Sequence, residues 1–278
     1  MMHALAPFLR DRFPGLRVRS LILGAAPVAG KSDEPWRQLP ALLPGSEIFG
    51  VDADGPNCWD ADIERAVIGW PEGPAAFHDT AAPMCGSLYR PDHAVLNRYA
   101  GLEVARETGQ HPVDVIALDN FTEGMRPVHF IQADIQGAEA DAFVGGKETL
   151  RSCLAVVAEV EFVPLYADQP LFGAVDEVLR ADGLEFHTFL GFAARPLHCS
   201  LERVRQAPFA QQILWADAVW YRRPETNDLA PENLARLAVL ADLYGHRDLA
   251  CLALDRLGPE IGRAYADGTI GMEQTVNV

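Results

Sequence analysis

Carboxylates at the ends of apolar segments are the residues of this sequence best suited to chemistry. Asp134 follows the mostly apolar segment 129–133, and Glu159 and Glu161 lie near the end of the apolar segment 154–162. An acidic side chain inside a strand costs too much free energy to be there for packing alone. A helix-like stretch follows each segment, so the pattern predicts the ligand-binding edge of an α/β sheet.

Two residues apart on a strand, Glu159 and Glu161 point to the same face of the sheet at its carboxyl end. We expect at least one of them to face a cleft, and an ion pair with an arginine of the C-terminal helices is the alternative. The alternative for Asp134 is to cap the next helix, since acids stabilise helix N-termini. Facing a cleft, such carboxylates suit a base that takes a proton from a hydroxyl group.

Strand-like and helix-like segments alternate along most of the chain. The segments 17–24 and 46–55 flank a short helical segment at 34–43, which predicts a βαβ unit with parallel strands. The irregular segment 81–110 is typical of a lid or substrate wall. The other predicted strands are 64–69, 75–80, 113–119, 129–135, 154–162, 184–191 and 212–223, the last of them antiparallel, and the other predicted helices are 1–15, 92–99, 138–150 and 171–182.

Two leucine-striped segments, 231–245 and 246–257, predict a C-terminal helical hairpin joined at Gly245. Their stripes are expected to pack on the sheet or on a second subunit, which would make a homo-oligomer through these helices. The predicted organisation is an N-terminal helical segment at 1–16, a Rossmann-like domain at 17–223, and the hairpin with a tail at 224–278.

Composition excludes several classes of function. The 278 residues carry a formal charge of −16, which repels a phosphate backbone and an anionic membrane surface, so we expect neither nucleic acid nor membrane as a partner. No apolar run reaches the length of a membrane helix, and no secretion signal is evident, so a cytoplasmic protein is expected. The five cysteines and the histidines lack the spacing of metal ligands, so no metal site is predicted.

Several segments together resemble one known family. They are FIQADIQGAEADAF, AEVEFVPLYADQPLF, GVDADGPNC, APMCGSLYRPD, ALDNF and LWADAVWYR. In this order they resemble the FkbM-type methyltransferases over roughly residues 18 to 223. That family is a branch of the class I fold that uses S-adenosylmethionine. The resemblance implies a mostly parallel seven-stranded sheet, Rossmann-like, with helices on both faces.

The resemblance also implies roles for individual residues. Gly24 and Ala25 would let the backbone approach the cofactor, and Asp52, with the adjacent Ala53, would accept hydrogen bonds from its ribose. Asp134 and Gln136 would lie beside the crevice and bind the cofactor, with Asp134 facing its cationic methionyl end or orienting an acceptor hydroxyl. Together with Glu159 and Glu161, Asp134 is a candidate base for methyl transfer to oxygen. The implied acceptor is a small molecule or glycan, with sugar and polyketide-type hydroxyls favoured.

One segment departs from the family pattern. Relatives tend to have D-x-G-A-N-x-G at the first turn, whereas this chain has ILGAAPVAG, with Ile22 in place of the acid. A non-catalytic binding or assembly protein with the same fold is therefore an alternative function. A nicotinamide-dependent oxidoreductase is a weaker alternative, because Asp52 fits a ribose but the G-x-G-x-x-G fingerprint is absent.

Overall fold

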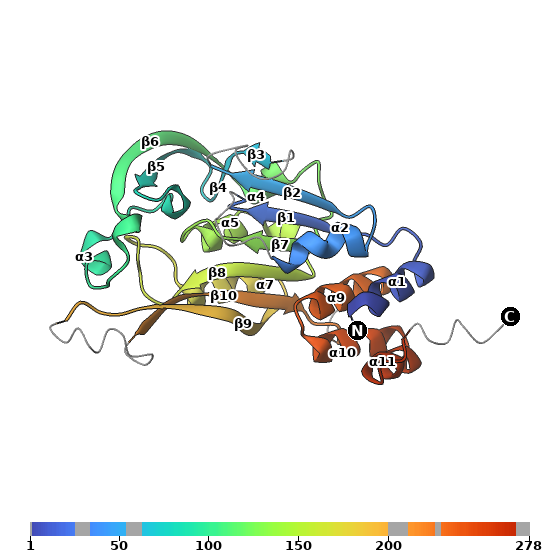
Figure 1. Cartoon of the computed structure of the whole chain (residues 1–278). Coiled ribbons are helices and arrows are strands. Elements are labelled where there is room, and N and C mark those ends of the chain that lie inside the picture. Colours follow the sequence, from blue (N-terminus) through green and yellow to red (C-terminus); the bar gives the residue numbers. More distant parts are fainter. Residues whose placement is uncertain (1, 26–33, 54–62, 200–210, 226–228, 271–278) are drawn as a thin grey trace.

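The computed structural model describes residues 2–25, 34–53, 63–199, 211–225 and 229–270, and a central sheet forms the middle of the fold. Among these residues, the sheet has seven strands in the order β3-β2-β1-β7-β8-β10-β9 (Figure 1). Their bounds are β1 Arg19–Leu23, β2 Glu47–Asp52, β3 Ile63–Arg65, β7 Phe130–Ala133, β8 Ala155–Glu161, β9 Leu184–Arg195 and β10 Gln212–Arg222. The predicted class I methyltransferase fold, Rossmann-like and mostly parallel, is confirmed.

The strands of the central sheet differ in burial and in direction. β8 is buried at all seven positions, as expected of a central strand with a layer on each face. β10 runs antiparallel to both of its neighbours, β8 and β9, whereas the other pairings in this sheet are parallel. The antiparallel strand predicted at 212–223 is therefore confirmed. Register shifts along the β9–β10 pair make β9 an irregular edge strand, which discourages pairing with other chains.

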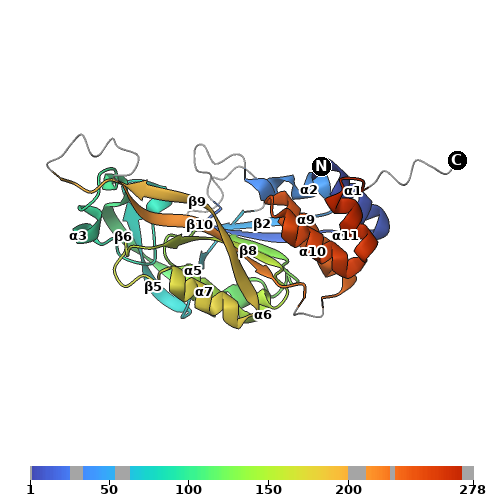
Figure 2. The ribbon, with the colours of Figure 1, turned by 90° about the horizontal axis from the view of Figure 1, so that it is seen from below.

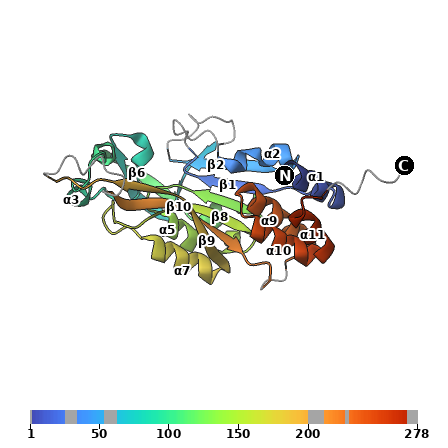
Figure 3. The ribbon, with the colours of Figure 1, turned by 60° about the horizontal axis from the view of Figure 1, so that its bottom comes forward.

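Helices cover both faces of the sheet, as predicted (Figures 2 and 3). One apolar core joins Ile22, Val157 and Val219 of the sheet to α1, η1, α2 and the C-terminal helices. The other joins their strand neighbours, such as Val156 and Trp220, to the helices after β6, β7 and β8. Adjacent residues of one strand thus serve opposite layers, which is the period of two of an extended chain. The bounds are α1 Met2–Arg12, η1 Pro35–Gln38, α2 Leu39–Leu42, α4 Leu118–Phe121, α5 Glu139–Val144, α6 Lys147–Leu150 and α7 Phe172–Ala181.

The C-terminal helices form the predicted hairpin, α9 (Pro231–Leu243) and α10 (Arg247–Leu257), with a positive φ at Gly245 between them. Most of their leucines, among them Leu240 and Leu254, pack in the core shared with the sheet and α1, whereas Leu252 is 38% exposed. Association through these helices with a second subunit stays a prediction. The tail predicted beyond the hairpin is partly wrong, because α11 (Pro259–Ala266) follows directly. Gly258-Pro259 resembles a helix stop, but proline also suits the first turn of a new helix.

A second, three-stranded sheet in the order β4-β6-β5 corrects part of the predicted strand pattern. Its strands are β4 Val67–Ile68, β5 Gly73–Thr80 and β6 Glu107–Ile116. The single strand predicted at 64–69 is split between the two sheets. β3 pairs with β2, and its last hydrogen bond runs from Ala66 N to Asp52 O (3.1 Å). The chain then leaves the central sheet, and β4 pairs with β6. The strand predicted at 113–119 begins earlier, at Glu107; its first half is largely exposed and polar, so no apolar pattern marks it.

Residues 81–105 form a wall over the carboxyl edge of the central sheet (Figure 1). This wall contains η2 (Pro83–Cys85), α3 (His93–Leu96) and η3 (Glu103–Ala105). Backbone hydrogen bonds tie it to the loop after β8, at Asp92 N to Leu165 O (2.9 Å), and to the segment after β9, at Ala100 N to Pro196 O (3.0 Å). An apolar core around the buried Tyr99 also joins it to residues after β8, such as Leu165, and to Leu214 of β10. Of the predicted lid or wall, the structure therefore shows a wall fixed by its contacts.

Gly24 tests how tightly the first turn is built. It has a φ of +76°, and an added Cβ would lie 1.9 Å from the carbonyl oxygen of Asp134. Gly24→Ala should therefore destabilise the chain by roughly 3 kcal/mol or more, measured by denaturant unfolding. Gly15→Ala is the matched control: φ is +80°, but the added Cβ meets nothing within 4 Å. It should cost only the backbone strain, about 1–2 kcal/mol. Equal losses in both variants would show that the close approach to Asp134 is unimportant.

Candidate functional site

The site begins where β1, β2 and β7 end side by side. The chain turns after β1 because the N–H groups of Gly24 and Ala25 both donate to the carbonyl of Val51, at 3.0 and 3.1 Å. On the other side of β1, Asp134 N donates to the carbonyl of Leu23 (3.0 Å). These bonds bring the ends of three parallel strands together, so Asp52 and Asp134 lie at one edge of the sheet.

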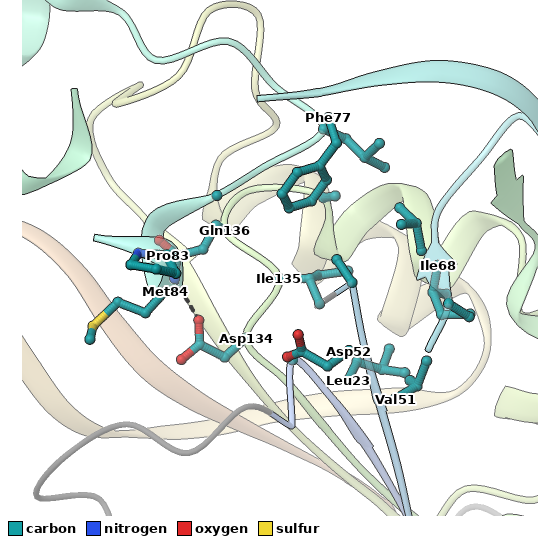
Figure 4. Close-up of a pocket in the computed structure, with 17 residues that line it drawn as sticks. Leu23, Val51, Asp52, Ile68, Phe77, Pro83, Met84, Asp134, Ile135 and Gln136 are labelled. Carbon is teal, nitrogen blue, oxygen red and sulfur yellow. Dashed lines mark hydrogen bonds between the residues drawn. The ribbon is translucent and has the colours of Figure 1, made fainter. Parts of the chain in front are cut away.

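A cavity of about 290 Å³ opens at this edge (Figure 4). Asp52 and Asp134 both line it, one on each side of the β1 end, and Gln136 is a third polar side chain in the lining, to which Gly24 and Ala53 also belong. The remaining lining is mostly apolar and comes from the small sheet, the wall and the strand ends: Leu23, Val51, Ala66, Val67, Ile68, Phe77, Pro83, Met84, Gly86, Leu88, Ile135 and Ala138. An apolar cavity with a few convergent polar groups is the usual form of a small-molecule site.

The loop after β7 carries a linked set of polar side chains. Gln136 Nε2 donates to Asp134 Oδ1 (2.6 Å) and to Glu159 Oε2 (2.9 Å). The hydroxyl of Tyr166 lies 3.0 Å from Gln136 Oε1, and Ser87 Oγ donates to the carbonyl of Gln136 (2.6 Å). The wall, the loop after β7 and the end of β8 are thus joined through one residue.

Glu139, in the first turn of α5, holds the same loop from beneath. Its two carboxylate oxygens accept hydrogen bonds from Ile135 N (2.7 Å) and Gly137 N (3.0 Å). Burial and the charge of Glu161 raise its pKa well above the ordinary value. Both oxygens are occupied by the backbone, so Glu139 has a structural role in the site.

Glu161 is 3% exposed, and its surroundings favour the neutral acid. Burial, with the charge of Asp134, raises its pKa from 4.5 to about 7. Glu159 and Glu161 lie opposite Asp217 and Trp215 of β10, which places both glutamates on one face of the sheet, as predicted from their spacing. A carboxyl group that titrates near neutral pH is suited to exchange protons with a substrate.

The structure brings together most of the predicted site residues. Gly24, Asp52, Ala53, Asp134 and Gln136 line the cavity. Glu159 reaches it through Gln136, and Glu161 lies two residues further along the chain. Ala25 differs: it is 2% exposed, its side chain packs in the core with α1 and the C-terminal helices, and its N–H is bonded to Val51. Ala25 is therefore outside the cavity lining described.

Some contributors gave little signal in the sequence. Ser87, Tyr166 and the apolar lining residues Phe77 and Met84 come from segments distant in sequence, and only the fold brings them to the strand ends. Cys85 also lies close by, but burial and the charges of Glu159 and Asp134 raise the pKa of its thiol to about 11. Its thiol is therefore not an activated nucleophile.

Metal binding and membrane insertion are two other features that the described residues can show. No group of three or more His, Cys, Asp and Glu side chains in the described part of the chain is arranged to hold a metal ion. Within those same ranges, no helix is both long enough and apolar enough to cross a membrane.

Comparison with known proteins identifies one segment of the chain. Residues 69–186 match the family model described as the methyltransferase FkbM domain. The predicted resemblance to FkbM-type methyltransferases is thereby confirmed for this segment, which carries Asp134, Glu159 and Glu161 but begins after Gly24 and Asp52.

A solved structure that matches is that of a TehB-like SAM-dependent methyltransferase from Corynebacterium glutamicum. It is 13% identical, with 80% of this chain and 89% of that chain covered, but the TM-score of 0.31 is too low to support any inference. No curated protein matches the chain significantly.

The raised pKa of Glu161 makes stability depend on pH. Between its unfolded value of 4.5 and its folded value of about 7 the folded chain holds the extra proton, so above pH 7 folding must bury a charge. Glu161→Gln removes that cost. Relative to the wild type, its Tm should rise as pH increases from about 5 to about 8.5, by a free energy on the order of 3 kcal/mol at most.

The exposed residue Glu103 provides the control for this experiment, because Glu103→Gln should leave the difference in Tm constant across the same pH range. A constant difference for Glu161→Gln as well would show that Glu161 is not held neutral in the folded chain.

Proposed function

We propose that this protein is an S-adenosylmethionine-dependent methyltransferase that transfers the methyl group to a hydroxyl oxygen of a small molecule or glycan. The observation that carries the proposal is the cavity bounded by Asp52 and Asp134 at the ends of β2 and β7, with Glu159 joined to it by Gln136. The FkbM domain match over residues 69–186 supports the same reaction class. We further propose a cytoplasmic location and a sugar or polyketide-type hydroxyl as acceptor.

The residues at the cavity fit this cofactor. Asp52 would accept hydrogen bonds from the ribose hydroxyls. Gly24 has no Cβ, which would strike the backbone of Asp134, so the first turn can lie close to the end of β7. Ile68 and Phe77 offer apolar surface for a purine, and Asp134 offers a negative charge to a cationic methionyl end. When bound, the cofactor supplies an electrophilic methyl group on a sulfonium.

The chain's own contribution to the reaction is positioning and proton transfer. The acceptor hydroxyl must lie near the methyl group and lose its proton, and effective alignment alone supplies much of the rate enhancement. Asp134, Glu159 and Glu161 are the candidate bases. Asp134 lines the cavity, and Glu159 is held beside it by Gln136, so these two are the better placed.

One observation favours a second candidate, a non-catalytic binding protein. At the first turn, where relatives carry an acid, the chain has Ile22, whose side chain is 3% exposed and belongs to the apolar core. That position supplies no polar contact to a cofactor, so the affinity must come from Asp52, Asp134 and the backbone. A cofactor titration separates the two candidates.

Cofactor binding is the first test. Isothermal titration calorimetry should show that S-adenosylhomocysteine binds and that NAD does not. Asp52→Asn should weaken the affinity about tenfold or more, because a charge-assisted hydrogen bond to the ribose contributes about 1.5–3 kcal/mol. Asp11→Asn, on the exposed surface of α1, removes the same charge far from the cavity and should leave the affinity unchanged. Binding of NAD alone would move the protein to the oxidoreductases, and binding of neither would leave it non-catalytic.

Methyl transfer is the second test. Labelled S-adenosylmethionine should methylate a member of a panel of monosaccharides, glycans and hydroxylated polyketide lactones. If Glu159 takes the proton, Glu159→Gln should lower kcat about 10²- to 10⁴-fold and leave the affinity for S-adenosylhomocysteine unchanged. An unchanged kcat in this variant would remove Glu159 from the reaction and leave Asp134 and Glu161 as the candidate bases.

A further inference from the structure

Gln136 has an unusual backbone conformation, and both N–H donors of its side-chain amide are hydrogen-bonded. Its φ is +55°, which is uncommon for a residue with a Cβ. Its two amide hydrogens point to different acids, Asp134 and Glu159, and its amide oxygen lies within hydrogen-bonding distance of the Tyr166 hydroxyl. An amide has two donors on nitrogen, so none is left for a bound ligand.

The backbone around Gln136 is fixed from both sides. Ser87 of the wall donates to its carbonyl, and Glu139 accepts from the N–H groups of Ile135 and Gly137 that flank it. A strained φ persists only where surrounding contacts determine it, and such residues cluster at functional sites. The loop therefore aims the amide at the two carboxylates.

Only an amide satisfies all the groups that meet at this point. A glutamate would add a third carboxylate beside Asp134 and Glu159 and, when ionised, could donate to neither. An apolar residue would leave both carboxylates and Tyr166 without these contacts, and hydrogen bonds to charged groups are stronger than those between neutral groups. The residue type is thus determined by the charges that it joins.

We propose that Gln136 is a positioning residue, whose amide holds the carboxyl groups of Asp134 and Glu159 in one fixed arrangement beside the cavity, rather than a residue that binds the cofactor directly. The inference rests on the proposed function for the use made of the two carboxylates. Ser87 of the wall donates to the main-chain carbonyl of Gln136, and Tyr166, which also bonds the carbonyl of Cys85 in the wall, lies at its amide oxygen, so the same residue links this arrangement to the wall.

Gln136→Glu tests the inference without any acceptor. With three carboxylates together, the folded variant binds an extra proton and loses stability as pH rises. Its Tm should lie close to the wild-type value at about pH 5.5 and on the order of 5 °C or more below it at about pH 8.5. Gln110→Glu, a matched change at an exposed position of β6, should show no such widening. A gap that is equal at both pH values would overturn the proposal.

A double variant guards against a chain that does not fold. Gln136→Glu combined with Glu159→Gln returns an amide and a carboxylate to the same pair, so most of the loss at high pH should be recovered. Absence of any recovery would contradict a direct link between the two side chains.

Titration with S-adenosylhomocysteine connects this arrangement to the cofactor. For Gln136→Glu, the affinity should fall about tenfold at pH 8.5 and approach the wild-type value at pH 5.5, since protonation relieves the added charge. A loss that is the same at both pH values would indicate direct contact with the cofactor and overturn the proposal. Failure of the wild type to bind would instead count against the proposed function, whereas the pH dependence of Tm tests the positioning role independently.

Discussion

The free-energy cost of holding several carboxylates together at a sheet edge shapes most of the candidate site. Asp134, Glu139, Glu159 and Glu161 come from the ends of β7 and β8 and the start of α5. Like charges held together out of water are unfavourable unless donors or protons compensate them. The structure compensates these charges in several ways. The pKa values of Glu139 and Glu161 are raised, Glu139 also accepts hydrogen bonds from two backbone N–H groups, and Asp134 and Glu159 share the amide of Gln136.

The fold divides the site into two parts with different origins. The N-terminal βαβ unit supplies Gly24 and Asp52, which lie outside the segment matched by the FkbM domain. The matched segment supplies the wall, strands β5 and β6 of the small sheet, Asp134 after β7 and the two glutamates near the end of β8. The cavity lies between these parts, so a ligand that filled it would contact both. The wall is tied by backbone hydrogen bonds at Asp92 and Ala100, which favours a preformed site.

Sequence reasoning located the strand ends well, because apolar segments followed by acids are a strong local signal. It therefore placed Asp52, Asp134 and Glu159 at one edge and predicted the common face of Glu159 and Glu161 from their spacing. It failed where the pattern is not local: the small sheet, α11, and the contacts of Ser87 and Tyr166 arise from tertiary packing. The sequence marks Gln136 only by its position beside Asp134. Its link to Glu159 depends on a φ of +55° that the sequence does not reveal.

Ala25 shows how little a residue type alone says about the direction of its side chain. A small residue after the first strand is typical of close approach to a cofactor, yet here its side chain fills the core beneath the turn. The residue type was compatible with both positions, and only the direction of the chain after Gly24 decides between them.

A crystal structure of the complex with S-adenosylhomocysteine tests the central claim most directly. The account predicts ribose density within hydrogen-bonding distance of Asp52, the methionyl end directed toward Asp134, and the amide of Gln136 still bonded to Asp134 and Glu159. Cofactor density away from the ends of β1, β2 and β7, or an amide of Gln136 turned from the carboxylates onto the ligand, would contradict it.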